Sequence, residues 1–210
     1  MSIESWLAFA TASAILLVIP GPTILTVIGY SVAQGRRAAV PLIAAVALGD
    51  STALALSLLG LGTLLAASSV AFTVVKLAGA VYLIYLGVKM LRAGFEASSS
   101  SATPRADTSR RRLFLNTYLV TATNPKGIIF YMAFLPQFVD AAAGNAVNQM
   151  WVLAATFVAL AIVNATLYTT FAGYAATLLA SGKARRWFNL GGGSLLSAAG
   201  LWMALGRRGV

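Results

Sequence analysis

Long apolar runs dominate the chain, and short polar stretches separate them. A helix that crosses the hydrocarbon core of a membrane needs roughly 20 mostly apolar residues. Runs such as LAFATASAILLVI lack the alternation of barrel strands, so helices are the expected elements. The pattern predicts an all-α membrane protein with six transmembrane helices. The expected spans are about 5–33, 38–62, 70–91, 113–139, 148–180 and 187–206.

One polar segment divides the six spans into two sets of three. Residues 94–112, GFEASSSSATPRADTSRRR, are rich in Ser and Ala and close to structureless by composition. We expect a single transmembrane domain whose halves, about 1–93 and 113–210, are joined by this linker. Because each half has three spans, the second half must be inserted upside down relative to the first.

The first span of each half is interrupted near its middle. Pro20-Gly21-Pro22 interrupts the first span, and Asn124-Pro125 interrupts the fourth. A proline inside a helix removes a hydrogen bond and clashes with the preceding turn, at a cost of about 3 kcal/mol or more. Both spans are therefore expected to be discontinuous helices at corresponding positions of two inverted repeats. That arrangement is typical of secondary transporters, although membrane helices also tolerate simple proline kinks.

The composition agrees with a membrane location. The chain is 59% hydrophobic and only 10% charged, whereas soluble domains carry about a quarter charged residues. Its net charge of +10 does not suggest nucleic acid, because the basic residues lie between apolar runs. Most of them fall in the connections at about 34–37, 94–112 and 181–186, which the positive-inside rule places in the cytoplasm with the N-terminus outside. Arg207 and Arg208 do not fit this orientation.

Two charges are expected deep in the membrane. Asp50 lies about 11 residues into its span, or roughly 16 Å from the end, and Lys126 follows the second break at a similar depth. Each charge costs at least about 2.5–3.5 kcal/mol at mid-bilayer. Mutual pairing, or a shared water-filled cavity between the halves, would relieve both. Asn164 belongs to an unusually polar stretch of the fifth span that would line a pathway or bond to other helices.

The chain has no Cys and no His, which excludes disulfides, thiolate or imidazole metal sites and every His-based triad. We expect no enzyme activity, no cofactor and no resident metal. A Ser–Lys dyad built on Ser13, Ser31, Ser51 or Ser57 has no supporting signature. A divalent metal-ion exporter and a passive solute channel remain alternatives. A site for a divalent metal ion requires several carboxylates, and Asp50 is the only acidic residue expected at mid-bilayer.

Three blocks of sequence resemble the LysE/RhtB amino-acid exporter family: PGPTILTVIGYSVAQGRRAAVPLIAAVALGD, KLAGAVYLIYLGVKMLR and TNPKGIIFYMAFLPQFV. Their order and spacing cover nearly the whole chain. The resemblance implies export of homoserine-, threonine- or lysine-like zwitterions across the bacterial inner membrane, by an antiport driven by protons. The family commonly has Asn where this chain has Thr23, and Gly where it has Ala39.

The resemblance and the breaks together suggest a binding site for a zwitterion. The expected site residues are Pro20, Gly21, Pro22, Thr23, Asp50, Asn124, Pro125, Lys126 and Asn164. The starts of the two half-helices, with Lys126, would hold the carboxylate. Asn124 suits an N-cap and Pro125 a first helical position. Asp50 would hold the ammonium group or take up the coupling proton. The expected partners are an amino acid, protons and the lipid bilayer, and the sequence leaves open whether the unit is a monomer or a homodimer.

Overall fold

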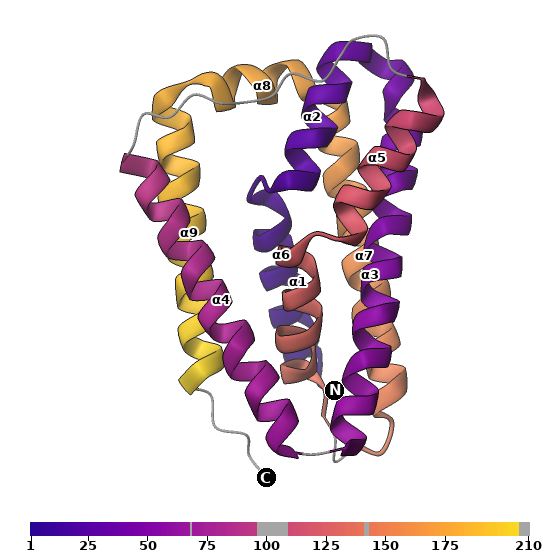
Figure 1. The fold of residues 1–210 in the computed structure, drawn as a ribbon, viewed down its shortest axis with the longest axis vertical. Helices are drawn as coiled ribbons and strands as arrows, with labels where there is room; N and C mark the ends of the chain where they lie inside the picture. The colour runs from indigo at the N-terminus through magenta and orange to yellow at the C-terminus, as the bar shows by residue number, and fades with distance from the viewer. Residues whose placement is uncertain (68, 96–108, 141–142, 206–210) are drawn as a thin grey trace.

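The computed structural model describes residues 1–67, 69–95, 109–140 and 143–205, and these are helical or in short connections, with no strand. The long elements form an upright bundle, and α8 runs across one end of it (Figure 1). The bounds are α1 Ile3–Val18, α2 Pro22–Gln34, η1 Gly35–Ala38, α3 Ala39–Ala67, α4 Ser69–Phe95, α5 Arg110–Ala122, α6 Pro125–Ile129, η2 Phe130–Phe134, η3 Leu135–Phe138, α7 Ala146–Thr170, α8 Ala172–Ala180 and α9 Gly182–Leu205.

Helices occupy all six expected segments. The second, third and sixth segments correspond to α3, α4 and α9. The first segment is divided into α1 and α2, and the fourth into α5 and α6, as the prolines predict. Most of the expected linker, at 96–108, lies outside the described residues, as do Arg207 and Arg208.

The fifth segment departs from the expectation of one helix over 148–180. It turns at Phe171, and α8 lies across the end of the bundle, where Ala175 packs against Ile24 and Ile28 of α2. The 25 residues of α7 already extend about 37 Å at 1.5 Å per residue, more than the roughly 30 Å hydrocarbon core. The remaining residues therefore gain more by covering α2 than by extending α7.

The helices present an apolar outer surface. Large side chains more than half exposed include Leu25, Leu56, Leu59, Val81 and Val163. Two helical stretches of the described chain are long and apolar enough to cross a membrane by length and composition: Pro22–Gly60, with 39 residues, and Ala146–Thr170, with 25. The apolar α1 is shorter. These features agree with a helical membrane protein, and the six-span inverted repeat stays a prediction.

Helices α4 and α9 pack closely over their length and stand to one side of α1 (Figure 1). Glycines set this close approach. A Cβ on Gly193 would lie 2.6 Å from the carbonyl oxygen of Gly87, and a Cβ on Gly200 would lie 2.7 Å from that of Ala80. Because the obstacles are backbone atoms that cannot move aside, a larger residue would force the two helices apart.

The other helices surround the two interruptions. Helix α3 packs against α5 and α7, and α1 packs against α7. An aromatic cluster fills the space beside α6 and η2: the rings of Phe130 and Phe134 are 4.8 Å apart, and those of Tyr131 and Phe157 are 4.9 Å apart. Figure 1 shows the α1–α2 and α5–α6 breaks at similar heights in the middle of the bundle.

Candidate functional site

The first break leaves two helix ends in the interior of the bundle. Helix α1 ends at Val18, and Ile19 is its C-cap in an extended conformation. Helix α2 begins at Pro22, and its N-cap, Gly21, has no side chain with which to bond the free N–H groups of the first turn. The ends of a helix leave backbone donors and acceptors without intrahelical partners. This break therefore depends on groups from elsewhere.

The second break supplies its own cap. Asn124 is the N-cap of α6, and its Oδ1 accepts a hydrogen bond of 3.1 Å from the backbone N–H of Lys126. Pro125 occupies the first turn, where its missing N–H is not needed. Both predictions for these two residues are confirmed. Thr123 closes the preceding helix, with its hydroxyl donating to the carbonyl of Leu119 at 2.7 Å.

The two breaks are in direct contact. The Nδ2 of Asn124 donates to the Oγ1 of Thr23 at 3.1 Å, which joins the starts of α6 and α2. The ammonium group of Lys126 donates to the carbonyl oxygens of Leu16 at 2.7 Å and Ile19 at 2.8 Å. A cation at the carboxyl end of a helix is favourable because that end carries partial negative charge. Lys126, which belongs to the other half of the chain, thus caps the C-terminal end of α1.

Two side chains of α7 complete this arrangement. The Nδ2 of Asn164 donates to the carbonyl of Leu17 at 3.1 Å, and the hydroxyl of Tyr168 donates to that of Val18 at 2.8 Å. Together with the two bonds of Lys126, they satisfy the four consecutive carbonyls from Leu16 to Ile19. The carbonyls of Leu16 to Ile19 at the end of α1 are therefore bonded by side chains from the second half of the chain.

Asp50 has a different partner from the one expected. The residue is only 8% exposed, and its carboxylate accepts a hydrogen bond of 2.7 Å from the hydroxyl of Tyr131, a fully buried residue. Asp50 and Lys126 form no direct ion pair, so of the two expected arrangements, mutual pairing or a shared cavity, mutual pairing is not the one found. The physical reason is that each group has a nearer partner: the carbonyl end of α1 for Lys126, and a phenol for Asp50.

The alternative expectation, a shared cavity, agrees with the structure. A small cavity of about 40 Å³ lies where the breaks meet, and both polar and apolar side chains line it. Its lining includes the predicted site residues Gly21, Thr23, Asp50, Asn124, Lys126 and Asn164. The remaining predicted residues, Pro20, Pro22 and Pro125, are not in its lining and act on the backbone at the two breaks. We call this space the polar pocket.

Two residues beside Asp50 in the lining, Tyr131 and Gly127, were missed by the sequence analysis. Tyr168 belongs to the polar stretch of the fifth span that the sequence singled out with Asn164. Gly127 and Tyr131 are four residues apart, and a Cβ on Gly127 would lie 3.3 Å from the Tyr131 hydroxyl oxygen. A glycine four residues before a tyrosine, just after a helix start, marks a face with room for the ring. That signal was available in the sequence.

The part of the chain that the structure describes holds no group of three or more His, Cys, Asp or Glu side chains that could bind a metal ion. The ammonium of Lys126 bonds to backbone carbonyls rather than to a serine hydroxyl.

Comparison with known proteins adds a family assignment. A family profile described as LysE type translocator matches residues 14–207. The homoserine/homoserine lactone efflux protein of Salmonella typhimurium is 35% identical over 208 residues, which is 99% of each chain. The leucine efflux protein of Salmonella choleraesuis is 31% identical over 148 residues, which is 70% of this chain and 69% of that protein. No solved structure matches the chain.

Proposed function

Because the chain belongs to the family of LysE type translocators, we propose that it is a secondary transporter that exports amino acids or their derivatives across the bacterial inner membrane. Members of this family are transporters and not enzymes, and the relatives described above are amino-acid efflux proteins by name. The observation that carries the proposal is the polar pocket, where helix ends from both halves meet beside a half-buried cation, Lys126, and a buried carboxylate, Asp50.

The pocket has the chemistry that a zwitterion requires. The carboxylate of an amino acid needs donors, and Lys126 together with the side-chain-free start of α2 at Gly21 can supply them. The ammonium group needs acceptors. Asp50 and the carbonyls of Leu16 and Ile19 can serve, once Lys126 has turned from those carbonyls to the substrate. The exchange conserves the number of charged contacts, so both substrate charges enter without leaving a buried group unpaired.

Asp50 is our candidate for the coupling proton. In the bundle interior a carboxylate is stable only with partners, and Tyr131 is its hydrogen-bond donor here. Protonation would remove the need for the ammonium of the substrate, and so link substrate release to proton entry. Coupling of this kind makes export depend on the proton gradient.

Alternating access follows from two inverted halves that rock about the pocket. The pairing of elements supports this design. The first span of each half packs on the second span of the other half: α1 packs on α7, and α5 packs on α3. The two second spans, α3 and α7, also pack on each other, and so do the two third spans, α4 and α9. With the N-terminus outside, the connection at Arg36 and Arg37 faces the cytoplasm.

A transport assay tests the proposal directly. Inside-out membrane vesicles containing the protein should accumulate radiolabelled amino acids, with homoserine, threonine, leucine and lysine as the first panel. Accumulation should require the proton gradient and vanish with an uncoupler. Uptake that an uncoupler leaves intact would indicate a passive channel. Protection of cells against toxic divalent metals, with no uptake of any amino acid, would indicate the metal exporter instead.

A further inference from the structure

The polar pocket is too small for the substrate that it is proposed to bind. Its volume is about 40 Å³, well below the roughly 300–1,000 Å³ of typical small-molecule sites. The groups of the pocket fit the two charges of an amino acid, but a side chain needs further space. One wall of the polar pocket must therefore move outward when the substrate binds.

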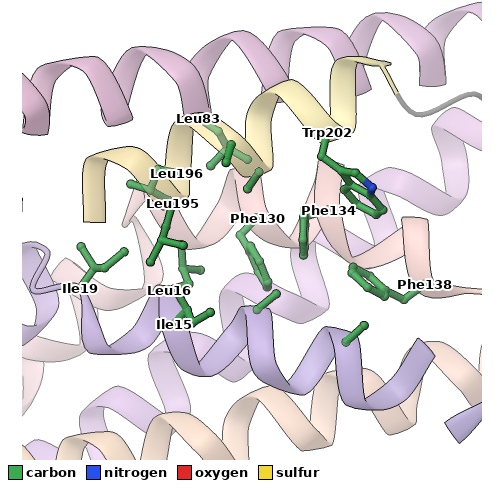
Figure 2. A pocket seen from close by; sticks show the side chains of 14 residues that line it. Ile15, Leu16, Ile19, Leu83, Phe130, Phe134, Phe138, Leu195, Leu196 and Trp202 are labelled. Carbon is green, nitrogen blue, oxygen red and sulfur yellow. The ribbon is translucent and has the colours of Figure 1, made fainter. Parts of the chain in front are cut away.

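A second and larger cavity lies directly behind one wall of the polar pocket. It has a volume of about 360 Å³ and lies between α1, α9, α4 and the segment η2–η3 (Figure 2). It is open to the apolar outer surface of the bundle, where its lining residues Ile15, Leu195 and Trp202 are 37%, 47% and 53% exposed. Figure 2 shows Phe130 and Phe134 in the middle of this group of side chains, with Leu195 and Leu196 to the left of them and Trp202 to the right. All its lining residues are apolar. We call this space the apolar cavity. Small-molecule sites typically occupy 300–1,000 Å³.

Leu16 and Ile19 separate the two spaces, because both residues line the polar pocket and the apolar cavity. Both side chains are apolar, so their rotation breaks no hydrogen bond. The other walls include Asp50, Asn124 and Asn164, each held by a hydrogen bond. They also include the apolar side chains of Leu17, Ile24, Val46 and Phe157, but none of these lines the apolar cavity, so they have no such space behind them. Ile19 also lies against α9, since a Cβ on Gly192 would lie 3.1 Å from its Cγ1. Opening toward the apolar cavity is therefore the least costly way to enlarge the pocket.

Lys126 holds the turn at the end of α1 that carries Leu16 and Ile19. Its ammonium group bonds to the carbonyls of Leu16 and Ile19. In the proposed binding step, the substrate carboxylate draws Lys126 away from these carbonyls. The turn that carries the two partition residues is then released at the moment when the side chain of the substrate needs room.

We infer that the apolar cavity is the side-chain subsite of the transporter, and that Leu16 and Ile19 form the partition that opens into it. The exported class is then amino acids whose side chain is apolar and several carbons long. The inference rests on the proposed function and adds the substrate class to it. Each methylene removed from water into an apolar site improves binding by roughly fourfold.

A homologous series of competitors tests this inference. Inside-out vesicles take up radiolabelled leucine in the presence of unlabelled alanine, 2-aminobutyrate, norvaline or norleucine. In the wild type, the concentration for half-inhibition should fall by roughly fourfold with each added methylene. In Ala199→Leu, which fills the cavity from α9, and in Ala12→Leu, which fills it from α1, the series should flatten, so that norleucine competes little better than alanine.

Ala204→Leu is the matched control, because Ala204 is exposed on the same helix α9 and does not line the cavity. It should retain the wild-type series, and immunoblots should show equal amounts of all variants in the membrane. The two filled variants approach the cavity from different helices, so misfolding of one leaves the other informative. A series that is flat in the wild type, or unchanged in both filled variants, overturns the inference.

The possible failures are distinguishable. Vesicles that carry homoserine or threonine but not leucine contradict the apolar subsite and leave the proposed function intact. An equal loss of transport for all competitors in the filled variants also contradicts it, because that result assigns the cavity to packing or to a lipid chain. Vesicles that carry no amino acid contradict the proposed function, and the subsite with it.

Discussion

The two helix breaks provide partners for their free backbone groups in opposite ways. At the second break, Asn124 caps α6 with its own side chain and Thr123 bonds back to the preceding turn. At the first break, Gly21 provides no cap, and the carbonyl end of α1 is held by Lys126, Asn164 and Tyr168 from the other half of the chain. The second break is self-sufficient, whereas the first can exchange its partners for those of a ligand.

The difference assigns distinct roles to the two halves. The second half brings the donors, and the first half brings the helix end that they hold. A substrate that enters between them competes for Lys126 and offers its own ammonium group in return. Variants that remove the donors should therefore affect transport far more than variants that loosen the contact between the breaks.

Lys126→Met should have the largest effect. It removes the cation and leaves the carbonyls of Leu16 and Ile19 without their donor, and hydrogen bonds to charged groups contribute about 1.5–3 kcal/mol each. Vesicle uptake should fall on the order of a hundredfold, and the thermal unfolding temperature of the purified protein should fall with it. Lys126→Arg keeps the charge and should retain part of the stability. Normal uptake by Lys126→Met would refute the role of this residue.

Asp50→Asn should come next. An amide oxygen can still accept the hydrogen bond from Tyr131, so the protein should remain folded with nearly unchanged thermal stability. The loss of the carboxylate removes both an acceptor for the ammonium group and the site for the coupling proton, and uptake should fall by roughly 10–100-fold. Counterflow exchange, which needs no net proton movement, separates the two roles. Retained exchange with lost accumulation supports proton coupling at Asp50, and uptake at wild-type rate excludes both roles.

Tyr131→Phe should have an intermediate effect. It preserves the ring and its edge contact with Phe157 but removes the donor to a buried carboxylate, so roughly a tenfold loss of uptake is expected. Tyr30→Phe is the control, because the Tyr30 hydroxyl accepts from Asn116 and lies outside the lining of the polar pocket. Equal effects of the two substitutions on uptake would contradict a specific role of Tyr131 in the polar pocket.

Thr23→Val should have the smallest effect. It removes the acceptor for the Asn124 amide and leaves the cap of α6 in place, because that cap uses the Oδ1 of Asn124. A neutral hydrogen bond contributes about 1 kcal/mol, so uptake should fall no more than about fivefold. A loss as large as that of Lys126→Met would contradict the view that the second break is self-sufficient.

The sequence predicted the features that depend on local chemistry. The positions of the breaks follow from proline, the cap at Asn124 follows from its side chain, and the apolar runs locate all six helical segments. The partners of the buried charges could not be predicted, because they depend on which helix ends meet in space. Lys126 bonds to backbone carbonyls, which are acceptors that residue identity does not reveal. The turn at Phe171 could not be predicted for the same reason, because it depends on the contacts that α8 makes with α2 in the folded chain.

Cysteine labelling tests the central claim, that the polar pocket at the two breaks binds the substrate. The chain has no cysteine of its own, so Thr23→Cys introduces a single thiol at the pocket, where the smallest functional cost is expected. A membrane-impermeant thiol reagent should reach it from both faces of the membrane, and a saturating substrate should slow both reactions. A thiol at exposed Ala204 should show no such protection. Labelling of Thr23→Cys that a transported amino acid leaves unchanged would contradict the account.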